Sequence, residues 1–161
     1  MILSLLFAGA LFVSAALVFW VQPLVGKMLL PMLGGTPAVW NTCMLFYQGT
    51  LLAGYGYALV LGRRLSLRTQ AVVQLLLLLL AAFLLPFHIK ESHLLTLPRE
   101  QNPVFWLLGV LVASVGLPFF ILSANGPLLQ SWFSRTRHPW ARDPYFLYAA
   151  SNAGSIGALM R

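Results

Sequence analysis

The stretch that decides the fold is QLLLLLLAAFLL, residues Gln74–Leu85. It shows neither the 3.6-residue period of an amphipathic helix nor the alternation of a half-buried strand. A helix surrounded by lipid can be apolar on every side. In hydrocarbon each backbone N–H and C=O has to be satisfied inside its own segment, which favours a helix over a strand. We therefore interpret this stretch as part of a helix that spans a membrane.

The composition of the whole chain also indicates a lipid environment. Hydrophobic residues make up 60% of the 161 residues and charged residues only 8%, with a mean hydropathy of +0.84. A soluble domain is about half apolar and about a quarter charged. Crossing ~30 Å of hydrocarbon takes about 20 apolar residues. Uncharged windows near this length recur along the chain, at residues 1–26, 31–62, 69–88, 101–134 and 144–160. The sequence predicts an integral membrane protein.

The predicted fold is all-α: a multi-pass transmembrane helical bundle of about five spans, forming a single domain over residues 1–161. No basic residue precedes Lys27, so we expect the first span to be retained rather than cleaved as a signal peptide. The predicted spans are Ile2–Trp20, Ala38–Leu61, Thr69–Phe87, Val104–Leu122 and Pro144–Met160.

Helix breakers follow the first span, in VQPLVGKMLLPMLGGTPAVWN, residues 21–41. Each proline removes a backbone donor and disfavours a continuous helix, and Gly34–Gly35 permits a tight turn. Thr36 is a suitable N-cap for the next span, with Pro37 at its first position. The segment is apolar, so we expect a short helix and turn, either lying at the interface or re-entering the membrane along a substrate path. The prolines are Pro23, Pro31 and Pro37.

A similar break is predicted after the fourth span. Pro118 lies inside the apolar run, and Asn125-Gly126-Pro127 reads as a stop. The apolar residues beyond it share one face of a short helix that we expect to lie on the membrane surface. Two broken segments after spans one and four suggest a three-helix repeat of the kind found in transporters. The shared-face residues are Leu128, Leu129, Trp132 and Phe133.

The basic residues predict the orientation. With alternating spans, two arginine-rich loops share one side with the N-terminus, which we therefore expect to be cytoplasmic. Such a basic patch suits anionic lipid headgroups, whereas no aromatic residues interleave with it as in a nucleic-acid site. We expect no nucleic-acid partner. The patch consists of Arg63, Arg64, Arg68, Arg135, Arg137 and Arg142, and the other side holds Lys27, Lys90, Arg99 and Arg161.

Polar and small residues inside the spans are the remaining candidates. Amides in lipid seek partners between helices and would line an interior cavity or path: Gln22, Asn41, Gln48, Asn125 and Asn152. Small residues let helices approach closely, either within the bundle or against a partner subunit. They form two ridges, Gly49, Ala53 and Gly54 in the second span, and Ala150, Gly154 and Ala158 in the last.

The sequence contains few residues suited to catalysis or to binding a cofactor. The only acids are Glu91, Glu100 and Asp143, and no glycine-rich nucleotide loop is present, so we expect no enzyme activity. The three histidines fall in loops on opposite sides, so we expect no haem, chlorin or metal, with His88 the first candidate ligand. The single cysteine, Cys43, is interpreted as a packing residue.

Two blocks carry a resemblance to a known family. PMLGGTPAVWNTCMLFYQGTLLAGYGYA (31–58) and SANGPLLQSWFSRTRHPWARDPYFLYAASNAGS (123–155) resemble the membrane region of bacterial proteins described as fused major-facilitator-like and spermidine-synthase-like. The resemblance implies the bacterial inner membrane, with further helices and often a synthase-like domain beyond the region matched. Neither lies within these 161 residues, which suggests a short member, a truncated one, or part of a longer protein.

The resemblance leaves two functions open. Major-facilitator transporters carry G-x-x-x-D-R-x-G-R-R after their second span, and GYALVLGRRLSLR keeps Gly62, Arg63 and Arg64 but lacks the aspartate and first arginine. We therefore expect first a non-catalytic structural or accessory subunit of a larger membrane assembly. The alternative is part of a transporter for a polyamine-like or amine solute.

Overall fold

The computed structural model describes residues 2–33, 36–83 and 103–160, and all regular structure in those residues is helical. The predicted fold class, a helical membrane bundle, is confirmed. Three helical stretches are long and apolar enough to cross a membrane: Ile2–Leu29, Pro37–Arg64 and Val104–Ser134. The elements are α1 (Ile2–Leu33), α2 (Pro37–Arg64), α3 (Leu67–Phe83), α5 (Pro103–Leu111), the π-helix η1 (Val112–Gly116), α6 (Leu117–Ser134), the 3₁₀-helix η2 (Pro139–Arg142) and α7 (Tyr145–Leu159).

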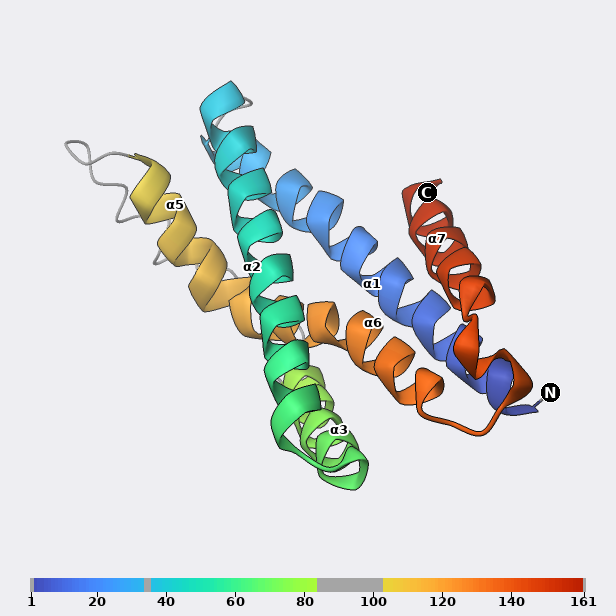
Figure 1. Ribbon diagram of the computed structural model, residues 1–161. Coiled ribbons are helices and arrows are strands. Elements are labelled where there is room, and N and C mark those ends of the chain that lie inside the picture. The colour runs from blue at the N-terminus through green and yellow to red at the C-terminus, as the bar shows by residue number, and fades with distance from the viewer. Residues whose placement is uncertain (1, 34–35, 84–102, 161) are drawn as a thin grey trace.

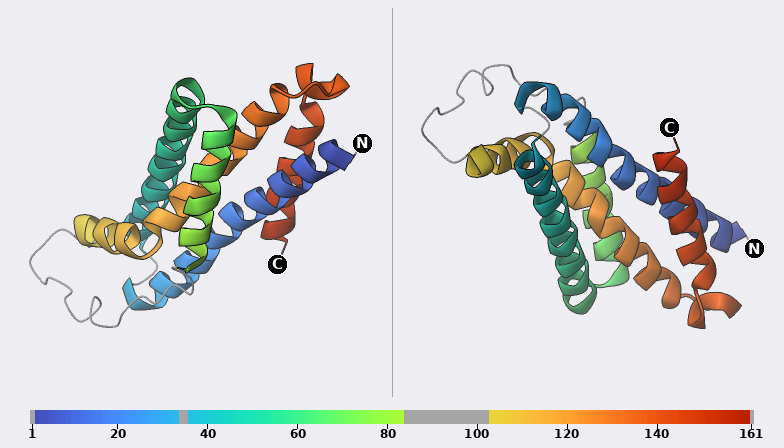
Figure 2. Two further views of the ribbon diagram at one scale, coloured as in Figure 1. Left: turned by 90° about the horizontal axis from the view of Figure 1, so that it is seen from below. Right: turned by 90° about the horizontal axis from the view of Figure 1, so that it is seen from above.

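The helices alternate in direction, as a chain that crosses a bilayer repeatedly must. Figure 1 shows α1, α3 and α7 running one way, and α2 and the α5–α6 segment running the other. Helix α6 occupies the middle of the bundle and contacts α1, α2 and α3, whereas α7 packs along α1 (Figures 1 and 2). Each predicted span overlaps one helical segment, but α1 and α6 extend beyond the predicted ends, and α3 and α7 are short, at 17 and 15 residues.

The predicted break after the first span is absent, because α1 continues as one helix through Pro23 and Pro31. Packing explains the continuation. Beyond Pro23, Val25 and Leu29 are 2% and 0% exposed in a core shared with α2, α5 and α6. Unwinding the helix in lipid would expose several backbone groups, whereas a proline removes one hydrogen bond. The predicted interfacial or re-entrant helix was therefore wrong.

Two further expectations concern residues 21–41: the start of the second span and the turn before it. The start of α2 is as predicted: Pro37 is its first residue, and the Val39 N–H donates to Thr36 Oγ1 at 3.5 Å. The Gly34–Gly35 turn lies outside the described residues, as does the end of the third predicted span, residues 84–87.

The predicted break after the fourth span is also absent. The chain stays helical from Pro103 to Ser134, and Figures 1 and 2 show its axis changing direction near η1. A π-helical turn ends at Gly116, two residues before Pro118, and shifts the hydrogen-bond register close to the position where the proline has no donor. Pro127 lies within α6, and Leu128 and Phe133 beyond it are 1% and 0% exposed. This region is the buried end of a long helix, so the predicted short surface helix was wrong, and the suggested repeat loses its basis.

The two arginine-rich loops lie at the same end of the bundle as the N-terminus (Figure 1). One loop joins α2 to α3, and the other joins α6 to α7. A direct contact connects them, since Arg135 Nη2 donates to the carbonyl oxygen of Gly62 at 3.2 Å. The predicted shared placement of the two clusters is thus present in the fold. We call this end of the bundle the arginine end.

Candidate functional site

The five amides predicted to line a path do not gather around one cavity. Asn125 and Gln22 are both half-buried, and the backbone carbonyl oxygen of Gln22 accepts from the Tyr47 hydroxyl at 3.3 Å. The others point outward from α2 and α7: Asn41, Gln48 and Asn152 are exposed. A site must therefore be built around Asn125 with different neighbours.

Those neighbours come from α3 and α1. Gln74 Nε2 donates to Asn125 Oδ1 at 2.9 Å and to the Ile121 carbonyl oxygen at 3.1 Å. Asn125 Nδ2 in turn donates to Ser14 Oγ at 3.1 Å. Gln74 is 2% and Ser14 7% exposed. Three helices far apart in sequence are thus joined by one chain of side-chain hydrogen bonds, which we call the amide network.

A second polar contact lies one turn away on α3. Gln70 is fully buried, and its Nε2 donates to the Leu65 carbonyl oxygen at 2.7 Å. Its Oε1 accepts from Trp132 Nε1 at 2.8 Å. Gln70 and Gln74 share one face of α3, because residues four apart are neighbours on a helix. Both were missed in the sequence, although two glutamines four residues apart in an otherwise apolar helix are a usable signal.

The interior also contains an unused acceptor and a small cavity. Gln74 Oε1 is buried and has no hydrogen-bond partner. A cavity of about 150 Å³ lies among α1, α2, α6 and α7, and three serine hydroxyl groups border it: Ser14, Ser123 and Ser151. Ligand pockets in proteins are usually about 300–1,000 Å³. This hollow is smaller than that, and the exposed side chains of Phe19 and Tyr55 form part of its lining.

Ionisable groups are scarce in this interior. Asp143 is the only acid in the described part of the chain, and it is exposed on the link between α6 and α7. No cluster of His, Cys, Asp or Glu suited to a metal occurs within residues 2–33, 36–83 and 103–160. The candidate ligand His88 and the acids Glu91 and Glu100 lie outside these ranges. The described interior therefore offers hydrogen bonding between helices rather than proton transfer.

The predicted small-residue ridges divide between inner and outer faces. Gly54 is buried where α2 meets α6, and Gly154 is buried where α7 meets α1. Ala150 and Ala158 are half-buried beside Gly154. By contrast, Gly49 and Ala53 are exposed on the outer side of α2.

Comparisons with known proteins add no relative. No family model, curated protein or solved structure matches this chain. The fold and composition define a multi-pass helical membrane protein, and the resemblance to the fused synthase family stays a prediction. Any functional proposal therefore rests on the residues described above.

Proposed function

We propose that this protein is a non-catalytic structural or accessory subunit of a larger membrane assembly. The observation that supports the proposal is that its buried polar side chains form hydrogen bonds between helices. Side-chain N–H groups of three buried or half-buried amides donate to a neighbouring helix or to the adjoining turn: Gln70, Gln74 and Asn125. Such bonds fix the positions of helices in lipid. On this proposal, the role of these polar groups is to hold the helices of the bundle together.

A partner helix would fit the outer face of α2. A side chain built at Gly49 or Gly56 would meet no atom within 4 Å, so both positions are open. Leu45 and Leu52 beside them are 61% and 74% exposed. On the opposite face of α2 a glycine already brings α6 into close contact, at Gly54. The outer face has the same small-residue chemistry and is available to a transmembrane helix of another subunit.

Purification in a mild detergent with mass spectrometry of co-eluting chains tests the proposal. We expect one or more membrane proteins to co-elute in a fixed ratio with the parent, and to be lost from the Gly49→Leu variant. Gly9→Leu on α1 is the matched control, because Gly9 is also exposed and a Cβ built there would meet no atom within 4 Å. A stable monomer in the parent, or equal loss from both variants, would contradict the proposal.

The orientation is part of the same proposal. We place the arginine end in the cytoplasm of a bacterium, in its inner membrane, because arginine-rich short loops stay on that side. Single cysteines introduced at Arg64 and Glu91 would report it in spheroplasts. The native Cys43 is 3% exposed and would react slowly. Labelling of both introduced cysteines from one side would contradict the topology.

A second candidate function is part of a small-solute transporter, and the amide network supports it. Gln74 Oε1 is an unused buried acceptor, and amide oxygens are suitable partners for the N–H groups of a polyamine or other amine. Spermidine uptake into proteoliposomes is the test. We expect Gln74→Leu and Asn125→Ala to lower the uptake, with Gln48→Leu on the exposed face as control. No uptake by the parent, or unchanged uptake in both variants, would remove this candidate.

A further inference from the structure

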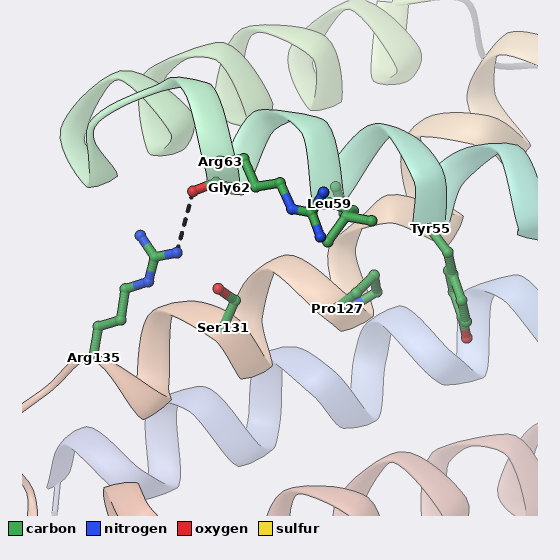
Figure 3. Close-up of a pocket in the computed structure, with 8 residues that line it drawn as sticks. Tyr55, Leu59, Gly62, Arg63, Pro127, Ser131 and Arg135 are labelled. Atoms are coloured by element: carbon green, nitrogen blue, oxygen red, sulfur yellow. Dashed lines mark hydrogen bonds between the residues drawn. The ribbon is translucent and has the colours of Figure 1, made fainter.

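The surface between α2 and α6 is hollowed into a groove at the arginine end. Its volume is about 390 Å³. Tyr55, Ala58 and Leu59 of α2 form one wall, and Pro127 of α6 lies on the other. Near the ends of both helices the lining becomes polar, as Figure 3 shows: Gly62, Arg63, Ser131 and Arg135. We call this the α2–α6 groove.

Two arginines line this groove. Arg135, just beyond α6, donates one Nη2–H to the Gly62 carbonyl oxygen at 3.2 Å and keeps further donors free. In Figure 3 the side chain of Arg63 runs along α2 toward Leu59, while Arg135 approaches Gly62. Asp143 is the only acid in the described ranges, and no ion pair joins it to either arginine. The two arginines that line the groove thus lack a carboxylate partner among the residues described.

The position of the groove along the helices determines which anion fits. Arg63 lies in the last turn of α2, and Arg135 follows the last residue of α6. Both therefore lie where membrane-spanning helices leave the hydrocarbon and meet the headgroups. Below them the wall is apolar, formed by Ala58, Leu59 and Pro127. A charged mouth above an apolar wall matches a phosphate attached to an acyl chain, whereas a free phosphate ion would use only the mouth.

We propose that the α2–α6 groove binds one anionic phospholipid. The phosphate lies between Arg63 and Arg135, where planar guanidinium groups can bind its oxygens in pairs. The Ser131 hydroxyl lies beside the same mouth and can donate to a headgroup oxygen. One acyl chain runs along Leu59 and Pro127 toward Tyr55. Because the groove joins two helices, the lipid would stabilise the α2–α6 pair.

Lipid titration of the full chain in dodecyl maltoside, followed by native mass spectrometry, tests this site. The probes are phosphatidylglycerol and phosphatidylcholine, which differ in net charge. We expect phosphatidylglycerol to bind more tightly, and the double variant Arg63→Gln with Arg135→Gln to bind it about tenfold more weakly, the scale of losing charge-assisted hydrogen bonds. The matched control, Arg68→Gln with Arg142→Gln, removes the same charge from the arginine end outside the groove. It should stay within about twofold of the parent, because neither Arg68 nor Arg142 lines the groove.

A neutral variant tests the groove without changing charge. Ser131→Leu should fill the mouth and also weaken phosphatidylglycerol binding. Inorganic phosphate should fail to displace the lipid at comparable concentrations, because it has no chain for the apolar wall.

Four results would overturn the proposal. They are equal weakening in the control pair, unchanged binding in Ser131→Leu, equal retention of phosphatidylcholine, and displacement by inorganic phosphate. Size-exclusion chromatography and circular dichroism on each variant separate loss of lipid from loss of fold.

Discussion

Two helix contacts in this bundle depend on a glycine, but the atoms opposite each glycine differ. A Cβ at Gly154 of α7 would lie 3.0 Å from the carbonyl carbon of Phe12 and 3.1 Å from its Cα, and would overlap its carbonyl oxygen. A Cβ at Gly54 of α2 would overlap the side-chain oxygen of Ser123 and lie 3.1 Å from the Ala124 nitrogen. The first contact is backbone against backbone, whereas the second involves a side chain first.

The difference determines how each contact can adapt. A side chain can rotate away from a new methyl group, but a helix backbone moves only as a whole. The α2–α6 contact also has further support from ring packing between Tyr57 and Phe120. The α1–α7 contact therefore tolerates less change in volume at its glycine.

The largest expected effect is that of Gly154→Ala. The methyl group has to push α7 away from α1, and overpacking of this kind costs about 1–3 kcal/mol, with this position at about 3. The free energy of unfolding can be measured by circular dichroism in mixed micelles of dodecyl maltoside and sodium dodecyl sulfate. Separation of α7 should also speed tryptic cleavage at Arg142.

Gly157→Ala is the matched control for that change. Its methyl group would meet only the Phe12 ring, at 4.0 Å, which is an ordinary contact. We expect a change within about 0.5 kcal/mol. Equal losses in Gly154→Ala and Gly157→Ala would show that the close backbone approach is not what limits position 154.

Gly54→Ala should have a smaller effect, of about 1–2 kcal/mol, because the Ser123 Oγ can rotate away, although the Ser123 Cβ stays 3.0 Å from the new methyl group. Removing the Ser123 hydroxyl should restore part of this loss. A double-mutant cycle with Ser123→Ala should therefore give a coupling of about 0.5–1 kcal/mol. No side-chain change at Phe12 should rescue Gly154→Ala in the same way. Strict additivity at positions 54 and 123 would contradict the distinction between the two contacts.

The sequence predicted the fold class, since long uncharged windows leave a chain few choices in lipid. Its predicted helix breaks at prolines were wrong. Pro23 and Pro127 read as breaks, yet α1 and α6 continue because the residues after them, Leu29 and Leu128, are buried between helices. Propensity is local, whereas that burial depends on segments distant in the chain.

The site was only partly predictable for the same reason. An apolar helix carries no period that tells its inner face from its outer face, so Asn125 could not be separated from the exposed Gln48. Gln70 and Gln74 lie in the most apolar stretch and were passed over, although polar residues there are expensive unless paired. The ridge of small residues was recognised, but only the structure divides Gly54 from Gly49.

Gln74→Leu should cost about 1 kcal/mol in the free energy of unfolding. The change removes the donor to Asn125 Oδ1 and to the Ile121 carbonyl oxygen, and interhelical hydrogen bonds in membranes contribute about 0.6 kcal/mol on average. Gln48→Leu is the control, because Gln48 is exposed on α2. A Gln74→Leu variant as stable as the parent would mean that the amide network contributes nothing to joining α1, α3 and α6.

The smallest effect is expected for Gly49→Ala, five residues before Gly54 on the same helix. A methyl group there would meet no atom within 4 Å, so nothing in the chain resists it. Alanine is favoured over glycine inside a helix by about 0.5–1 kcal/mol, so the purified protein should be unchanged or slightly more stable. The same micelle unfolding assay measures it. A loss as large as that of Gly54→Ala in the purified chain would mean that another copy of this protein already occupies the outer face of α2.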